Sequence, residues 1–160
     1  MEHAEKSYIE YENKTLSLLK EKIIANGGNR NNLHEQYKYI YHQRLHIFDL
    51  VELDKNDQII SVYEVKTLTA IKSNYNYIYK LLLRYKMITK AKVFIVYIDD
   101  NEQLNILPFE NYRTIRRGPQ RAHSSSVTSF NDFYRKLLMK CDNESGLRYF
   151  LEGIQNTITR

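Results

Sequence analysis

The chain has 160 residues, with 24 Lys and Arg against 19 Asp and Glu, and a formal net charge of +5. This length predicts a single domain with its own core, and the lone cysteine, Cys141, excludes an internal disulfide. The longest apolar run, Val93 to Ile98, is too short to cross a bilayer, and no apolar signal segment opens the chain. We therefore expect a cytoplasmic protein without a membrane partner, whose positive charge suits a polyanion.

The first predicted helix covers residues 3–25 and ends at Gly27-Gly28, a common helix-stop signal. Four apolar residues recur at helical spacing and form one stripe: Ile9, Leu16, Leu19 and Ile23. Glu12 occupies a position within this stripe. Its carboxylate is expected either at the edge of the buried face or pointing into a functional site.

Three strands are predicted next, at residues 37–41, 44–53 and 58–67, because these segments are rich in Ile, Val, Leu, Phe and Tyr. Residues 54–57 combine Asp, Lys and Asn and predict a four-residue turn. The second and third strands should therefore form a β-hairpin.

The turn length predicts the register of this hairpin. A four-residue turn places Asp49 opposite Val62, and side chains alternate with period two. Asp49, Glu64 and Lys66 then project to one side of the sheet, with Glu64 diagonal to Asp49. Charges within apolar strands are expensive unless they are paired, solvated or bound to a metal. The other interpretation is a solvated face that carries an ordinary Glu–Lys ion pair.

The second half of the chain predicts a helix over residues 71–90, strands at 92–98 and 103–108, a basic loop at 113–123 and two C-terminal helices. The expected fold class is α/β, with a mixed central sheet flanked by helices. We expect one domain over residues 1–160, with a core at about residues 5–108 and the basic loop and C-terminal helices within 109–160.

Asp49, fourteen intervening residues and then Glu64-Val65-Lys66 resemble the signature of the PD-(D/E)xK nuclease superfamily. The likeness covers Ile9 to about Ile98, in the element order αβββαβ. It is nearest to the Holliday-junction resolvase, Mrr and restriction-endonuclease-like branches. Phe48 stands where that pattern often has proline, and the second helix shows no clean Gln-x-x-x-Tyr motif.

The resemblance implies a metal-dependent endonuclease that hydrolyses phosphodiester bonds in DNA. It implies Asp49, Glu64 and the carbonyl of Val65 as ligands of Mg²⁺ or Mn²⁺, which prefer oxygen donors. Lys66 would orient the attacking water or stabilise charge on the phosphorane, and Glu12 is the candidate for an additional acidic group. By analogy with dimeric members, the C-terminal helices are a candidate homodimer interface.

Basic residues outside this centre are candidates for phosphate contacts, which add affinity without sequence choice. They lie in the basic loop and on the second helix: Arg113, Arg116, Arg117, Arg121, Lys80 and Arg84. A solvated, mobile loop with few apolar anchors is the alternative for the first four. Three other functions stay open: an RNA endonuclease with the same metal site, a non-catalytic nucleic-acid-binding module on this fold, and a protein-interaction domain with an acidic partner.

Overall fold

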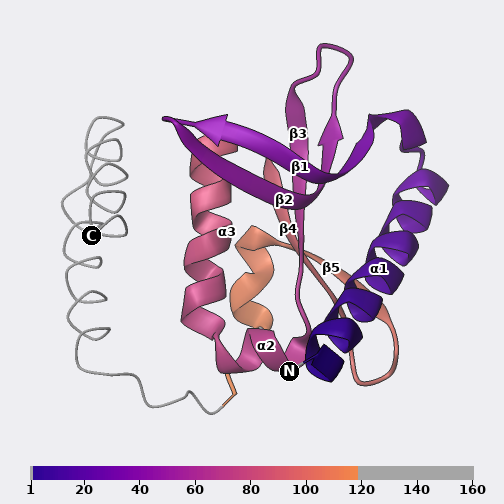
Figure 1. Cartoon of the computed structure of the whole chain (residues 1–160), viewed down its shortest axis with the longest axis vertical. Coiled ribbons are helices and arrows are strands. Elements are labelled where there is room, and N and C mark those ends of the chain that lie inside the picture. Colours follow the sequence, from indigo (N-terminus) through magenta and orange to yellow (C-terminus); the bar gives the residue numbers. More distant parts are fainter. Residues whose placement is uncertain (1, 119–160) are drawn as a thin grey trace. The chain divides into compact units, whose positions relative to one another are not determined.

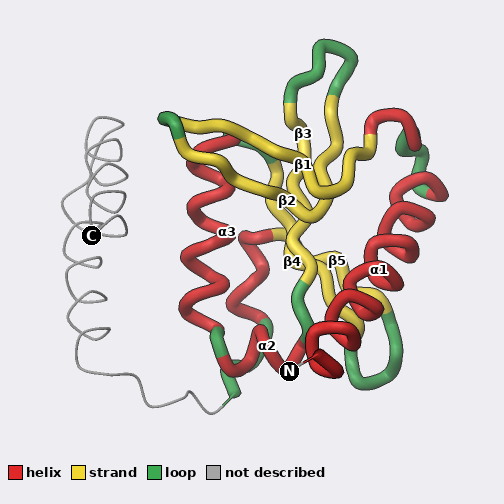
Figure 2. Tube along the Cα trace, in the orientation of Figure 1, coloured by secondary structure: helices red, strands yellow, loops and turns green. Residues whose placement is uncertain are grey.

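The computed structural model describes residues 2–118, in which a mixed β-sheet carries helices on both faces (Figures 1 and 2). The predicted C-terminal helices and Arg121 lie outside these residues. The elements in chain order are α1 (Glu2–Ala25), η1 (Arg30–Asn32), β1 (Leu33–Tyr41), β2 (Arg44–Leu53), β3 (Ile59–Val65), α2 (Leu68–Ser73), α3 (Tyr75–Thr89), β4 (Lys92–Ile98), β5 (Leu104–Pro108) and η2 (Phe109–Thr114). No helix within residues 2–118 has both the length and the apolar character that a membrane crossing requires.

The five strands follow the order β1-β2-β3-β4-β5, so each strand pairs with its neighbour in sequence. β3 and β4 are parallel, and the other three pairs are antiparallel. A parallel pair needs a crossover connection, and α2 and α3 provide it. These features confirm the predicted α/β class, the mixed sheet and the order of helix, three strands, helix and strand.

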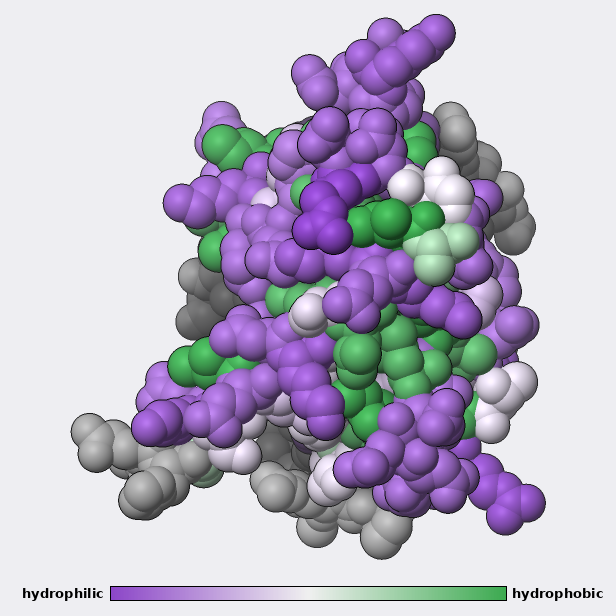
Figure 3. Space-filling view, turned by 90° about the vertical axis from the view of Figure 1, so that its right-hand side faces the viewer, coloured by the Kyte–Doolittle hydropathy of each residue, from purple (hydrophilic) through white to green (hydrophobic). Residues whose placement is uncertain are grey.

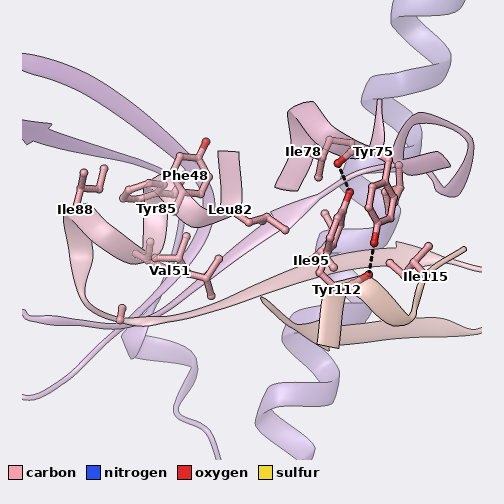
Figure 4. Close-up of a cluster of buried hydrophobic side chains, with 14 of the residues drawn as sticks. Phe48, Val51, Tyr75, Ile78, Leu82, Tyr85, Ile88, Ile95, Tyr112 and Ile115 are labelled. Carbon is pink, nitrogen blue, oxygen red and sulfur yellow. Dashed lines mark hydrogen bonds between the residues drawn. The ribbon is translucent and has the colours of Figure 1, made fainter. Parts of the chain in front are cut away.

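Hydrophobic side chains cover both faces of the sheet. On one face, α3 and η2 pack against β2, β3 and β4, as Figure 4 shows in close-up. Tyr75 and Tyr112 join α3 to η2 there, because each hydroxyl donates to the main-chain carbonyl of the other residue, at 3.3 and 2.8 Å. On the other face, Leu16 and Leu19 of α1 pack against the central strands. β3 and β4 are buried at their centres and consist mostly of apolar residues, which made them visible in the sequence.

The apolar stripe of α1 differs from the predicted one at its start. Leu16 and Leu19 are buried, but Ile9 is 52% exposed. Tyr8 and Glu12 precede Leu16 and Leu19 at helical spacing and occupy the sheet-facing positions instead. The predicted helix over 71–90 is also two helices, because Asn74 ends α2 and precedes α3.

The β2–β3 hairpin has a register that is shifted by two residues from the prediction. Val51, and not Asp49, lies opposite Val62, and the pairing is irregular between Glu52 and Leu53. Next to the turn the shift is one residue, because Leu53 pairs with Ile59, and the irregularity adds the second. The Asp54 carboxylate accepts hydrogen bonds within the turn from the main-chain N–H groups of Asn56 and Gln58, at 2.7 and 3.0 Å. From Glu52 back to Asp49 the shift is two residues, which leaves Asp49 and Glu64 on one face as predicted.

Candidate active site

Asp49 and Glu64 lie level with each other on neighbouring strands. Leu50 pairs with Tyr63, so the next pair along the hairpin is Asp49 and Glu64. The main-chain N–H of Val65 donates to Asp49 Oδ2 at 2.8 Å and fixes that carboxylate beside β3. The two acids are therefore direct cross-strand neighbours, closer than the predicted diagonal arrangement.

Lys66 completes the group at the end of β3. Its Nζ donates to Glu64 Oε1 at 2.6 Å, as expected for residues two apart on one face of a strand. Glu64 is 4% exposed, and its Oε2 has no hydrogen-bond partner among the described residues. A solvated Glu–Lys pair on the surface is therefore the wrong interpretation of these charges.

Burial dominates the electrostatics of the two acids. It raises the pKa of Glu64 to about 7, with a further contribution from the negative charge of Asp49. Burial also raises the pKa of Asp49, against the opposing effects of the Val65 N–H and of Lys66. Burial alone would lower the pKa of Lys66, but the charges of Glu64 and Asp49 outweigh it and raise the pKa. Such perturbed groups, gathered in one place, are a mark of functional sites.

Helix α1 extends beyond the apolar core and places Tyr8 and Glu12 beside this group. Burial, followed by the charge of Asp49, raises the pKa of Glu12. Burial likewise raises the pKa of Tyr8, and the positive charge of Lys66 opposes it. Figure 3 views the α1 side, where hydrophilic residues cover most of the surface and hydrophobic ones gather near its middle.

Gln36 of β1 holds Glu12 at the rim of the site. Its Nε2 donates to Glu12 Oε1 at 2.9 Å. Glu35 pairs with Leu50 and Tyr37 with Phe48, so Gln36 lies level with Asp49. Gln36 has a φ of 47°, which is strained for a residue other than glycine. The strained backbone thus lies next to the candidate centre, where such strain is often found.

The donor set for a cation is the two carboxylates of Asp49 and Glu64. Within residues 2–118, no three His, Cys, Asp or Glu side chains gather into a metal-binding group. Glu12 therefore lies near Asp49 and Glu64 but does not form a three-carboxylate group with them. One of its carboxylate oxygens accepts a hydrogen bond from Gln36. The unpartnered Oε2 of Glu64 beside Asp49 nevertheless fits a hard cation, because such an atom is costly to bury alone. The oxygen donors present are the type that Mg²⁺ prefers.

The predicted phosphate-binding residues divide into those at and after η2 and those on α3. The Arg113 guanidinium lies 5.3 Å from the centroid of the Tyr79 ring, and the Arg117 guanidinium lies 5.8 Å from that of Tyr75. The predicted basic loop, residues 113–123, begins inside η2. Tyr112 and Ile115 are buried and hold its first residues against the core. Arg116 is exposed.

Lys80 and Arg84 belong to α3 itself. Arg84 lies close enough to β2 that its charge, after burial, is the next largest cause of the lowered pKa of His46. At about 100° per residue, Arg84 and Tyr79 point to different flanks of α3. The structure therefore separates Arg84 from Arg113, which the sequence had grouped together.

Two tyrosines of this site were missed in the sequence. Tyr8 precedes Glu12 by four residues on one face of α1, a spacing that could have revealed it once Glu12 was singled out. Tyr11 donates from its hydroxyl to the main-chain carbonyl of Lys66 at 3.2 Å. Tyrosine is so frequent in this chain, with 14 residues, that composition alone points to neither.

Neither a protein-family model nor a curated protein matches this sequence.

Proposed function

We propose that this protein is a metal-dependent endonuclease that hydrolyses phosphodiester bonds in DNA, as the resemblance of Asp49, Glu64 and Lys66 to the PD-(D/E)xK superfamily implies. The observation that supports it most is the Glu64 carboxylate. It is buried, one oxygen is held by Lys66, and the other oxygen has no hydrogen-bond partner within residues 2–118. Buried carboxylate oxygens are normally paired, so this oxygen beside Asp49 is a natural position for a bound cation.

Asp49 and Glu64 would hold Mg²⁺ or Mn²⁺, with the carbonyl of Val65 as the proposed third donor. The ion, when bound, polarises the scissile phosphate and provides a nucleophile near neutral pH. The Val65 N–H keeps Asp49 facing β3, and the ion pair with Glu64 keeps the Lys66 ammonium at the same place. Lys66 would then stabilise the negative charge that develops on the phosphate in the transition state.

The net charge of +5 supports a nucleic acid as substrate. We propose Arg84 and Lys80 as phosphate contacts. Arg113 and Arg117 lie against tyrosine rings, and stacking of this kind also stabilises the fold. Their part in nucleic-acid binding is therefore proposed to be smaller.

A cleavage assay tests this function. Purified protein is incubated with plasmid, branched DNA and single-stranded RNA in Mg²⁺, Mn²⁺ or EDTA, beside the variants Glu64→Gln and Asp49→Asn. We expect metal-dependent DNA cleavage that both substitutions abolish. Glu110→Gln is the matched control, because Glu110 pairs with Lys86 at an exposed position.

The other outcomes separate the remaining functions. Preferential cleavage of RNA, lost in the same variants, would make the protein an RNA endonuclease. Binding without cleavage, unaffected by metal or by either substitution, would contradict the proposal and leave a non-catalytic binding module.

A further inference from the structure

The hydroxyl of Tyr11 lies between the ends of two parallel strands. It accepts a hydrogen bond from the main-chain N–H of Ile98 at 3.0 Å and donates one to the main-chain carbonyl of Lys66 at 3.2 Å. Tyr11 belongs to α1, so one side chain connects this helix to the ends of both β3 and β4.

This hydroxyl takes the place of a hydrogen bond of the sheet. Val65 pairs with Val96 in the parallel register, and the N–H of Lys66 donates to the carbonyl of Val96 at 3.0 Å. In a regular parallel ladder, the carbonyl of Lys66 would then accept directly from the N–H of Ile98. The structure instead inserts the Tyr11 hydroxyl between these two groups, and both main-chain groups stay satisfied.

The insertion separates β3 from β4 at Lys66. Directly after it, the chain leaves the sheet at Thr67, whose side chain accepts from the N–H of Ala70 and begins α2. The Lys66 ammonium donates to Glu64 at 2.6 Å. Because the Lys66 side chain starts from the main chain at this point, a shift of that main chain would change how the ammonium meets Glu64. A direct bond between Lys66 and Ile98 would draw that position toward β4.

We propose that Tyr11 is a positioning residue, whose hydroxyl sets the separation of β3 and β4 at Lys66 and so aims the Lys66 ammonium at the Asp49–Glu64 pair. Its consequence for cleavage rests on the proposed nuclease function. Its consequence for the environment of Lys66 does not.

Tyr11→Phe tests this role, because it removes the hydroxyl and keeps the ring. Tyr39→Phe is the matched control, since the Tyr39 hydroxyl also donates to a main-chain carbonyl, that of Ile88, at 3.2 Å. In single-turnover cleavage, we expect Tyr11→Phe to lower the rate roughly 10- to 100-fold, the range of a small misplacement of a reacting group. Tyr39→Phe should leave the rate unchanged.

A double-mutant cycle separates positioning from general destabilisation. If Tyr11 acts through Lys66, Tyr11→Phe has no further effect in a Lys66→Ala background. An equal loss of rate in both backgrounds would overturn the proposal.

A second readout does not need activity. The ¹⁵N-lysine side-chain spectrum reports the shielded ammonium of Lys66, and we expect its signal to shift in Tyr11→Phe and to stay in Tyr39→Phe. An unmoved signal together with wild-type cleavage would overturn the role of Tyr11 and leave the nuclease function standing. A shifted signal in a protein that cleaves no substrate would support the positioning and contradict the nuclease function.

Discussion

Two lysine–glutamate ion pairs in this fold differ in their surroundings. Lys66 and Glu64 pair inside the sheet, where Glu64 is 4% exposed and faces a second acid. Lys86 and Glu110 pair at the outside of α3, with 40% and 59% of their side chains exposed. The pKa values of Glu64, Lys66 and the neighbouring Asp49 are all raised. Lys86 and Glu110 form an ordinary surface ion pair. Burial beside Asp49 is therefore what distinguishes a candidate centre from a common ion pair.

The largest expected difference between the two pairs is in catalysis. Lys66→Ala removes a charge that is placed for the transition state, so we expect the cleavage rate to fall 100- to 1000-fold, about 3–4 kcal/mol. Lys86→Ala should stay within about twofold of wild type, as expected for a surface residue outside the centre. Single-turnover cleavage measures both. A Lys66→Ala rate above a tenth of wild type would remove Lys66 from the mechanism.

The pH dependence of stability sharpens the same comparison. The folded protein holds the pKa of Glu64 near 7 against an ordinary 4.5, so it binds more protons than the unfolded chain between these values. Its free energy of unfolding should then fall as the pH rises through this range, by roughly 3 kcal/mol for a shift of this size.

Glu64→Gln should lose the part of this slope that Glu64 contributes and keep the smaller part from Asp49, whose pKa is also raised by burial. Glu110→Gln should keep the whole slope. Urea denaturation of the metal-free proteins at pH 5, 6, 7 and 8 provides the measurement. Parallel pH profiles for Glu64→Gln and wild type would show that Glu64 is not buried as an acid with a raised pKa.

The two groups of arginines offer a smaller test. Arg84→Ala should reduce the slope of log affinity against log salt by about one, because one phosphate contact is lost. Arg113→Ala should leave the slope nearly unchanged, since its guanidinium lies on the Tyr79 ring. DNA binding measured by fluorescence anisotropy at several salt concentrations decides between them. A reduced slope in Arg113→Ala and an unchanged slope in Arg84→Ala would place the DNA-contacting surface on the η2 side of α3.

The smallest effect is expected for the stability of the outer pair. Breaking the exposed contact with Lys86→Ala should change the free energy of unfolding by less than about 1 kcal/mol. Thermal unfolding of the variant beside wild type measures this. A larger loss would show that the Lys86 stem is important for packing on Phe109, whose ring centroid lies 5.6 Å from its ammonium.

Much of the fold could be predicted because its strands are apolar. β2 and β4 begin and end at the predicted residues, since their apolar residues contrast sharply with the polar turns beside them. The hairpin register could not be predicted, because the irregular pairing between Glu52 and Leu53 has no signal in the sequence. Asp49, Glu64 and Lys66 still share one face, since the error beside them was two residues.

The candidate site was predicted in part for the same reason. Asp49, Glu64 and Lys66 stand out as charges within apolar strands. Tyr11 gives no such signal, because its role depends on where β3 and β4 end in space and not on its neighbours in sequence. Arg113 was grouped with the loop residues because nothing in the sequence shows that Tyr79 lies beside it.

The most direct test of the central claim is divalent-cation binding at Glu64. Titration of Mn²⁺ into the protein, followed by electron paramagnetic resonance, measures the free ion without any substrate. We predict a single tight site in wild type that Glu64→Gln and Asp49→Asn abolish, that Mg²⁺ displaces, and that Glu110→Gln retains. Mn²⁺ binding that survives Glu64→Gln, or wild-type protein that binds no Mn²⁺, would contradict a metal centre at the Asp49–Glu64 pair.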